Sequence, residues 1–188
     1  ETEGMGLDLG GIAKGYAGDE AVRILKKNGV THALVNLGGN IAVVNGKEDG
    51  TPWRIGIQNP RMEEDKKKRR RVAVVETKGE AVVTSGDYER YMTEVYQKTG
   101  KRYHHIFDPQ TGYPANNGVI SATVLTKNGI DADALTTSLF ILGVKDGLKL
   151  ADQLGVPAML ITQDKKLYFS KGLEGKVSGI HPDYKIAN

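Results

Sequence analysis

The chain has 188 residues, of which 39% are hydrophobic, 24 are glycine and none is cysteine. This composition is typical of one globular α+β domain over residues 1–188, and it excludes disulfides and thiolate chemistry. The net charge of +3 is concentrated in residues 61–71, which hold seven basic and three acidic side chains. Charge confined to one loop argues against a nucleic-acid-binding surface, and no apolar run reaches the roughly 18 residues of a membrane-spanning helix.

Residues 4–15 are rich in glycine and predict a short strand ending near Leu9, followed by a helix. The helix is expected because apolar side chains recur at a period of about 3.6 residues, at Ile12, Tyr16, Ala17, Ala21 and Leu25. The N–H groups of a glycine corner before a helix can bind phosphate oxygens. Lys14 lies in the first turn, where a cation opposes the helix dipole unless an anion is bound nearby. The alternative is a packing turn, since the spacing matches neither a Walker A loop nor a GxGxxG fingerprint.

Short strands are predicted next. Residues 32–37 and 41–44 are expected to pair around Gly38 and Gly39, with Asn36 and Asn40 capping the turn. Further strands are expected at residues 53–58, 72–76 and 81–84. The charged residues 63–71 are expected to form a solvated hairpin loop.

A second hairpin is predicted after the turn at residues 84–87. Residues 88–97, with tyrosines at 88, 91 and 96, are expected to form its first strand, and residues 102–107 its second. The hairpin would bring residues 84–87 close to the polar stretch that follows it.

Residues 104–114 read His-His-Ile-Phe-Asp-Pro-Gln-Thr-Gly-Tyr-Pro and combine two imidazoles, a carboxylate and a hydroxyl. Pro109 disfavours helix at Asp108, and Gly112 allows a tight turn. We expect a rigid polar corner beside a sheet, the kind of place where binding and catalytic groups are found. The alternative is a well-formed turn whose two histidines are merely solvated.

Residues 128–143 predict a helix in which Asp133 and Thr137, four residues apart, share one face. A carboxylate and a hydroxyl offer the hard oxygen ligands that Mg²⁺ prefers. The alternative is an ordinary first turn, with the carboxylate answering the helix dipole. The rest of the prediction is a strand at 119–126, a second helix at 145–154, a hairpin at 157–162 and 166–169, and a polar tail.

Four stretches together resemble the ApbE family in order and spacing, and the resemblance covers nearly the whole chain. They are Asp-Leu-Gly-Gly-Ile-Ala-Lys-Gly-Tyr-Ala at 8–17, Asn-Leu-Gly-Gly-Asn at 36–40, Thr-Ser-Gly-Asp-Tyr-Glu-Arg-Tyr at 84–91 with His-Ile-Phe-Asp-Pro-Gln-Thr-Gly-Tyr-Pro at 105–114, and Ala-Asp-Ala-Leu-Thr-Thr-Ser-Leu-Phe-Ile-Leu-Gly at 132–143. The family comprises the FAD:protein FMN transferases. The resemblance implies an α+β fold, in which a mixed or antiparallel sheet packs with helices and FAD lies in a cleft. It also implies Mg²⁺-dependent transfer of FMN from FAD to a Ser or Thr hydroxyl of a target protein, with release of AMP.

The resemblance also implies a metal site. By position, Mg²⁺ is expected to be held by Asp133, by Thr137 and by the backbone carbonyl of Gly11, a position that is often Ala in the family. Thr136 occupies a position that is acidic in some relatives. The resemblance therefore implies one negative charge fewer here and weaker metal binding.

Four further residues match positions that the family uses for FAD or for catalysis. Asp8 and Lys14 match FAD-contacting positions, and Phe107 matches a position whose main chain lies along the cofactor. His105 matches the position suggested for a base that takes the proton of the target hydroxyl.

The resemblance also suggests partners and a location. Family targets resemble subunits of NADH:quinone reductases and Rnf-type complexes, so an acceptor protein of this kind is expected. Family members carry a long segment before the Asp-Leu-Gly-Gly motif, with part of the FAD pocket and, in many, a lipoprotein signal. Seven residues precede Asp8 here, so a chain that lacks this segment is expected, with the full-length form membrane-anchored outside the cytoplasm. Two other functions stay open: an FAD pyrophosphatase that releases FMN and AMP, and a flavin-binding module without catalysis.

Overall fold

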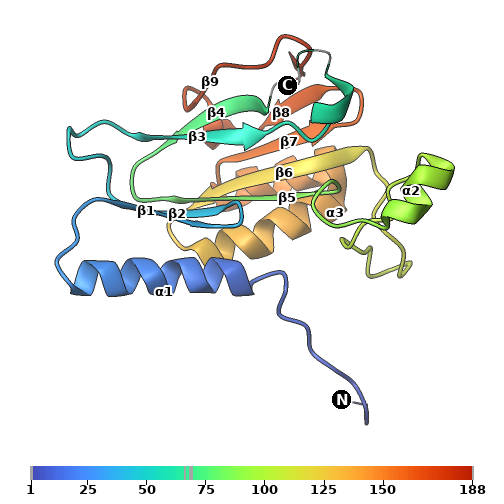
Figure 1. Cartoon of the computed structure of the whole chain (residues 1–188), viewed down its shortest axis with the longest axis horizontal. Coiled ribbons are helices and arrows are strands. Elements are labelled where there is room, and N and C mark those ends of the chain that lie inside the picture. The colour runs from blue at the N-terminus through green and yellow to red at the C-terminus, as the bar shows by residue number, and fades with distance from the viewer. Residues whose placement is uncertain (1, 66, 68–69, 188) are drawn as a thin grey trace.

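The computed structural model describes residues 2–65, 67 and 70–187, and it has an α+β fold (Figure 1). A seven-stranded sheet lies at its centre, in the order β1-β2-β5-β6-β7-β8-β10. Its neighbouring strands are antiparallel except for the parallel pair β8 and β10. The strands are Ala33–Leu37 (β1), Asn40–Val44 (β2), Ala81–Gly86 (β5), Val119–Thr126 (β6), Ala158–Thr162 (β7), Lys166–Phe169 (β8) and Lys185–Ile186 (β10).

A smaller sheet and the helices complete the fold. The second sheet has the order β3-β4-β9 and consists of Trp53–Gln58 (β3), Arg71–Thr77 (β4) and Val177–Ser178 (β9). The α-helices are Ala13–Lys27 (α1), Thr93–Thr99 (α2) and Gly129–Leu154 (α3), and two short 3₁₀ turns are Met62–Glu64 (η1) and Lys171–Leu173 (η2). In the described part of the chain, no helix is both long and apolar enough to cross a membrane.

The main sheet lies between two layers (Figure 1). Helices α1 and α3 cover one of its faces, and the second sheet covers the other. One apolar core joins the two sheets, and a second joins the main sheet to α3; their larger members are Ile41, Val82, Leu125, Ile57 and Val75 in the first and Val83, Val124, Leu139 and Phe140 in the second. The predicted α+β class with a largely antiparallel sheet packed against helices is confirmed.

Most predicted strands are confirmed close to their predicted bounds, because alternating or continuous apolar residues mark them clearly. The β1–β2 turn is built around Asn36, whose Oδ1 accepts a hydrogen bond from Gly39 N–H at 2.9 Å. The capping role predicted for Asn40 is wrong. Asn40 is 4% exposed, and neither atom of its amide has a partner among the described residues.

The most deeply buried residues of helix α1 are two glycines, Gly15 and Gly18. Of the predicted apolar stripe, Ile12, Ala21 and Leu25 are half-buried, whereas Tyr16 and Ala17 are exposed. The helix crosses α3 so closely that a carbon added at Gly15 would overlap the carbonyl oxygen of Gly129. The predicted helix is therefore confirmed and its apolar stripe is correct in part, because direct backbone contact at glycine joins it to α3.

Asp19 of α1 caps the start of α3. Its Oδ1 accepts from Gly129 N–H at 2.6 Å, and its Oδ2 accepts from Ile130 N–H at 3.0 Å. The first N–H groups of a helix have no partner inside the helix, so a carboxylate there satisfies them and complements the dipole. One helix thus fixes the position of the other.

The strand predicted to end near Leu9 is absent. Met5, Leu7 and Leu9 are 74%, 86% and 53% exposed, and the segment before α1 runs away from the body in Figure 1. A strand needs a neighbour for its backbone hydrogen bonds, and no strand of the described chain lies beside this segment.

The strand predicted at residues 88–97 is also wrong. This segment forms a turn and then α2, which Gly100 ends in a left-handed conformation with φ of 70°. The spaced tyrosines serve a different purpose, because the Arg102 guanidinium lies 5.4 Å from the ring centre of Tyr91 and 4.8 Å from that of Tyr96. A single bridge between Tyr91 and His104 keeps the expected link to the following stretch.

The two predicted helices at 128–143 and 145–154 meet at a break inside α3. Gly143 has φ of 77° and ψ of −176° and interrupts the helical geometry. Asn117 Nδ2 donates to the carbonyls of Phe140 and Ile141 at 2.9 and 2.8 Å, so the end of the first half has partners. The amide of Asn117 therefore ties residues 113–118 to α3.

Residues 63–71 were predicted to form a solvated loop, but part of this charged run is buried. Asp65 is 6% exposed, and its Oδ2 lies 2.9 Å from His181 Nε2. This contact fastens the run to the C-terminal tail. Residues 66, 68 and 69 of the predicted loop lie outside the described residues.

We expect Gly15→Ala to destabilise the fold, because its new carbon would lie 2.8 Å from the Asp133 side chain as well as overlapping Gly129. Overpacking of this kind costs about 1–3 kcal/mol, measurable by urea unfolding. Gly6→Ala is the matched control, since no atom lies within 4 Å of a carbon added there. Equal stability of the two variants would contradict the close crossing of α1 and α3.

Candidate functional site

The glycine corner before α1 meets the face of α3 that carries Asp133 and Thr137. Gly15 N–H donates to Asp133 Oδ2 at 2.8 Å, across 118 residues of sequence. A carbon added at Gly11 would lie 4.0 Å from Thr137 Oγ1. Two segments that were predicted to share a metal ion therefore lie side by side.

Asp133 is a buried carboxylate, 4% exposed. Among the described residues, no lysine, arginine or histidine forms an ion pair with it, and Gly15 N–H is its hydrogen-bond donor. A buried charge without a cationic partner is costly. Carboxylate, hydroxyl and backbone carbonyl are all hard oxygen donors, so the residues present fit a divalent cation such as Mg²⁺.

Thr136 and Ser85 support Asp133 from the sheet side. Thr136 is fully buried, and its Oγ1 donates to the Asp133 carbonyl at 2.8 Å. Ser85 Oγ lies 2.8 Å from Thr136 Oγ1 and must be the donor, because the single Thr136 hydroxyl proton is already used. The resemblance had singled out Thr136 for its position, whereas Ser85 and Gly15 are supporting groups that the sequence reasoning missed. Their signal was their place inside the quoted stretches 84–91 and 8–17.

Asp8 and Lys14 lie at the same glycine corner. Asp8 Oδ1 accepts from Gly10 N–H at 2.6 Å, which closes the turn. Lys14 is exposed in the first turn of α1, and in the described structure no carboxylate pairs with it. An anion that approaches the corner would therefore meet an unpaired ammonium group.

His105 and Phe107 lie on a separate loop, residues 100–118. His105 Nδ1 lies 3.1 Å from the Arg90 carbonyl, and both His105 and Phe107 are exposed. A carbonyl can only accept, so Nδ1 carries the proton in the neutral ring and Nε2 keeps a lone pair. Among the described residues, neither side chain forms a hydrogen bond with Gly11, Asp133 or Thr137.

The loop is nevertheless docked on α3. The rings of His104 and Phe140 meet edge to face at 5.5 Å between centres, about one turn after Thr137. The five predicted residues Asp8, Gly11, Lys14, Asp133 and Thr137 thus form one group, and the loop with His105 and Phe107 is held on the same helix.

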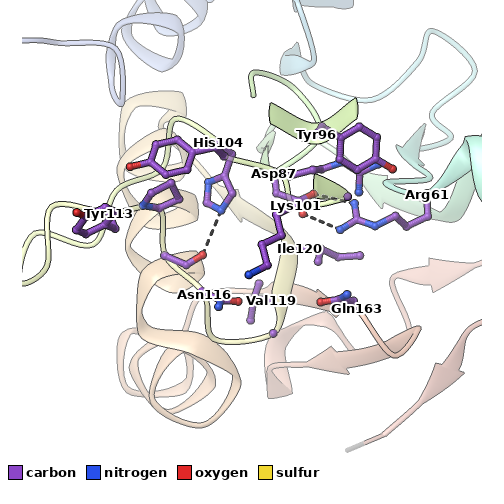
Figure 2. A pocket seen from close by; sticks show the side chains of 16 residues that line it. Arg61, Asp87, Tyr96, Lys101, His104, Tyr113, Asn116, Val119, Ile120 and Gln163 are labelled. Carbon is purple, nitrogen blue, oxygen red and sulfur yellow. Dashed lines mark hydrogen bonds and ion pairs between the residues drawn. The ribbon is translucent and has the colours of Figure 1, made fainter. Parts of the chain in front are cut away.

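His104 is buried and held in one neutral tautomer. Its Nδ1 accepts from Ile106 N–H at 3.3 Å, and its Nε2 donates to the Ala115 carbonyl at 3.1 Å (Figure 2). Burial lowers the pKa of His104 below its ordinary value of 6.5, with the Ala115 carbonyl opposing part of that effect. His104 therefore supports the loop, and the exposed His105 beside it is the residue with a free lone pair.

A pocket of about 310 Å³ lies between two of the stretches that carry the resemblance. Asn36, Gly38 and Gly39 line it from the β1–β2 turn, Thr84 lines it from β5, and Glu89 lines it from the turn after β5. The turn and the strand end therefore share one concave surface.

Asp65, His181 and Asp183 form another group whose possible ligand atoms lie within 4.8 Å of one another. His181 Nδ1 accepts from Asp183 N–H at 3.1 Å, so its Nε2 carries the proton toward Asp65. Both ring nitrogens are thus engaged in holding the C-terminal tail. This arrangement accounts for the cluster without a metal.

Comparison with known proteins identifies the family. Residues 1–160 match the ApbE family. The chain belongs to the ApbE family. An FAD:protein FMN transferase of Klebsiella pneumoniae (strain 342) is 36% identical over 187 residues, and one of Treponema pallidum (strain Nichols) is 38% identical over 183 residues. These matches cover 99% and 93% of this chain but 55% and 48% of the two relatives, so the chain spans about half of their length.

Solved ApbE structures have the same fold. The ApbE protein of Thermotoga maritima matches with a TM-score of 0.81 at 35% identity, over 94% of this chain and 55% of that one. The flavin transferase ApbE of Vibrio cholerae matches with a TM-score of 0.75 at 35% identity, over 89% of this chain and 52% of that one.

We expect stability to fall as the pH drops below about 6.5, because protons that His104 binds in the unfolded chain are excluded from the folded one. The pKa of His104 is lower in the folded chain than in the unfolded chain. The contribution of His104 to stability is therefore complete above the unfolded pKa and is lost below the folded pKa. His104→Gln should flatten the dependence of urea midpoints measured between about pH 7.5 and about pH 5. An equally steep dependence in the variant would show that His104 is not the titrating group.

Proposed function

We propose that this chain transfers FMN from FAD to a Ser or Thr hydroxyl of an acceptor protein and releases AMP. The observation that carries this proposal is the meeting of the glycine corner with Asp133 and Thr137. The names of the relatives support it, since those proteins are FAD:protein FMN transferases. By resemblance, we also propose that the acceptor is a subunit of an NADH:quinone reductase or Rnf-type complex, and that the transferase is a membrane-anchored lipoprotein outside the cytoplasm.

The proposed metal ligands are Asp133 Oδ, Thr137 Oγ1 and the Gly11 carbonyl. A bound Mg²⁺ supplies charge neutralisation to diphosphate oxygens, which is the main requirement for splitting a pyrophosphate. Thr136 bonds the main-chain carbonyl of Asp133 and Ser85 bonds Thr136, so both brace the helical turn that carries Asp133. Because the site offers a single carboxylate, we infer that it binds the metal more weakly than a site with two.

Lys14 is proposed to bind the diphosphate of FAD. Its ammonium group is unpaired in the described structure and lies one turn from Gly11. The neighbouring N–H groups of Ala13 and Gly15 are already bonded, to Leu9 O and Asp133 Oδ2, so the ammonium group and the helix dipole supply the positive charge for phosphate oxygens. Asp8 and the main chain of Phe107 are proposed to contact FAD, as the family resemblance implies.

His105 is proposed to act as the base. Its Nε2 lone pair takes the proton of the acceptor hydroxyl, whose oxygen then attacks the phosphorus on the FMN side of the diphosphate. The bond from that phosphorus to the bridging oxygen breaks, and AMP leaves with that oxygen. A base in this position contributes roughly 10²–10⁴-fold to the rate.

We expect Asp133→Asn to abolish Mg²⁺-dependent transfer, with a loss of about 10²–10⁴-fold, because a metal ligand supplies several kcal/mol. The amide oxygen of Asn keeps an acceptor for Gly15 N–H, so the fold should survive. The assay follows the mass of the acceptor after incubation with FAD and Mg²⁺. Asp131→Asn, an exposed carboxylate in the same helical turn, is the matched control. Transfer at the wild-type rate by Asp133→Asn would remove the metal site.

His105→Gln should slow transfer by roughly 10²–10⁴-fold while FAD binding, measured by calorimetry, stays nearly unchanged. His32→Gln is the matched control, because His32 Nδ1 also bonds a backbone carbonyl, that of Gly46 at 2.8 Å. An unchanged transfer rate would exclude the base role. AMP release that needs no acceptor protein would instead identify an FAD pyrophosphatase, and FAD binding without turnover would identify a flavin-binding module.

A further inference from the structure

A cavity of about 640 Å³ lies against the 100–118 loop, and none of Gly11, Lys14, Asp133 or Thr137 lines it (Figure 2). We call it the Lys101 pocket. The residues that matter for its chemistry are Arg61, Asp87, Lys101, Arg102, Asn116 and Gln163. His104 also lines it, so the buried face of the loop forms one of its walls while the exposed His105 follows directly in the chain.

The floor of the pocket is a buried ion pair. Arg61 Nη1 and Nη2 donate to Asp87 Oδ1 and Oδ2 at 2.8 and 2.6 Å, and the two side chains are 8% and 9% exposed. Two parallel hydrogen bonds fix the planar guanidinium against the carboxylate. The floor is therefore rigid and carries no net charge.

A second ion pair neutralises Arg102 at the side of the pocket. Its Nη2 donates to Glu63 Oε1 at 2.6 Å, and its guanidinium stacks on Tyr91 and Tyr96. The Arg102 Nε is buried and has no partner among the described residues. The wall thus keeps one unused N–H donor although its charge is balanced.

Lys101 brings to the pocket a positive charge that no ion pair among the described residues neutralises. Figure 2 shows its side chain reaching into the pocket toward Asn116 and Val119. Among the described residues, no carboxylate pairs with Lys101, and His104 is neutral in its buried tautomer. The pocket therefore presents one net positive charge, with the amides of Asn116 and Gln163 beside it.

An exposed aromatic pair forms the outer wall. Tyr103 and Tyr113 are 37% and 64% exposed, line the pocket, and meet edge to face at 6.5 Å. Exposed tyrosines are enriched at protein interfaces because they offer a large rigid surface with a polar tip. A single cation inside an aromatic rim matches one carboxylate on a polypeptide better than a diphosphate, which carries more charge.

We propose that the Lys101 pocket binds an acidic side chain, Asp or Glu, of the acceptor protein and so places the neighbouring acceptor hydroxyl at His105. The inference rests on the proposed function for the identity of the partner. Side chains of consecutive residues in an extended segment point to opposite sides. The same loop can therefore present His104 to the pocket and His105 to the acceptor hydroxyl. Lys101 is a specificity residue in this scheme and takes no part in the chemical step.

Binding can be tested without turnover. The probes are a short peptide with one glutamate and one serine, and the same peptide with glutamine in place of glutamate. Titration of the ¹⁵N-labelled chain should shift the amide resonances of Lys101, Tyr103 and Gln163 with the glutamate peptide and much less with the glutamine peptide. Lys101→Glu should weaken binding at least about tenfold. Lys98→Glu, the same charge change on the exposed end of α2 outside the pocket, should leave it unchanged.

Three results would overturn the proposal: equal binding of the two peptides, no effect of Lys101→Glu, or saturable shifts of the same resonances by FAD alone, which would assign the pocket to FAD. In the transfer assay, Lys101→Glu should raise the KM for the acceptor with little change in kcat or in the KM for FAD. If the wild-type chain binds the peptides as expected but shows no transfer, the proposed function is wrong and the binding site is still supported. Normal transfer with a KM insensitive to Lys101→Glu would defeat the site alone.

Discussion

The close crossing of α1 and α3 is the constraint on which the candidate site depends. Two glycines, Gly15 and Gly129, let the two backbones touch, and any side chain at either position would overlap the other helix. Asp19 then caps α3 from α1, and Asp133 of α3 accepts a hydrogen bond from α1. These reciprocal bonds fix the glycine corner against the carboxylate, where we propose that a divalent cation and a diphosphate bind.

The end of β5 links this crossing to the rest of the molecule. Successive side chains of a strand point to opposite faces, and β5 uses this alternation at its last residues. Ser85 faces α3 and holds Thr136, whereas Thr84 lines the pocket between the sheets. Two residues later, the Asp87 carboxylate accepts two hydrogen bonds from the Arg61 guanidinium. One short segment therefore contacts α3 through Ser85, lines a pocket together with β3 through Thr84, and binds Arg61 through Asp87.

The sequence predicted most strands, and the shared helical face of Asp133 and Thr137, better than the packing of the helices. Alternating apolar residues marked most strands, and the spacing of Asp133 and Thr137 predicted a shared helical face that the structure contains. The contact of α1 with α3 was not predicted, because a glycine contact leaves no apolar pattern to detect. The segment 88–97 was misjudged because its tyrosines pack on Arg102, a partner that follows α2 and that no local pattern reveals. Asp65 was assigned to a solvated run because its partner His181 lies 116 residues away.

The central claim is that Gly11, Asp133 and Thr137 hold one divalent cation. Crystals grown with Mn²⁺ in place of Mg²⁺, measured at the manganese absorption edge, locate such an ion directly. The account predicts an anomalous peak within bonding distance of an Asp133 carboxylate oxygen, Thr137 Oγ1 and the Gly11 carbonyl. A peak at Asp65, His181 and Asp183 with none at Asp133 would contradict it.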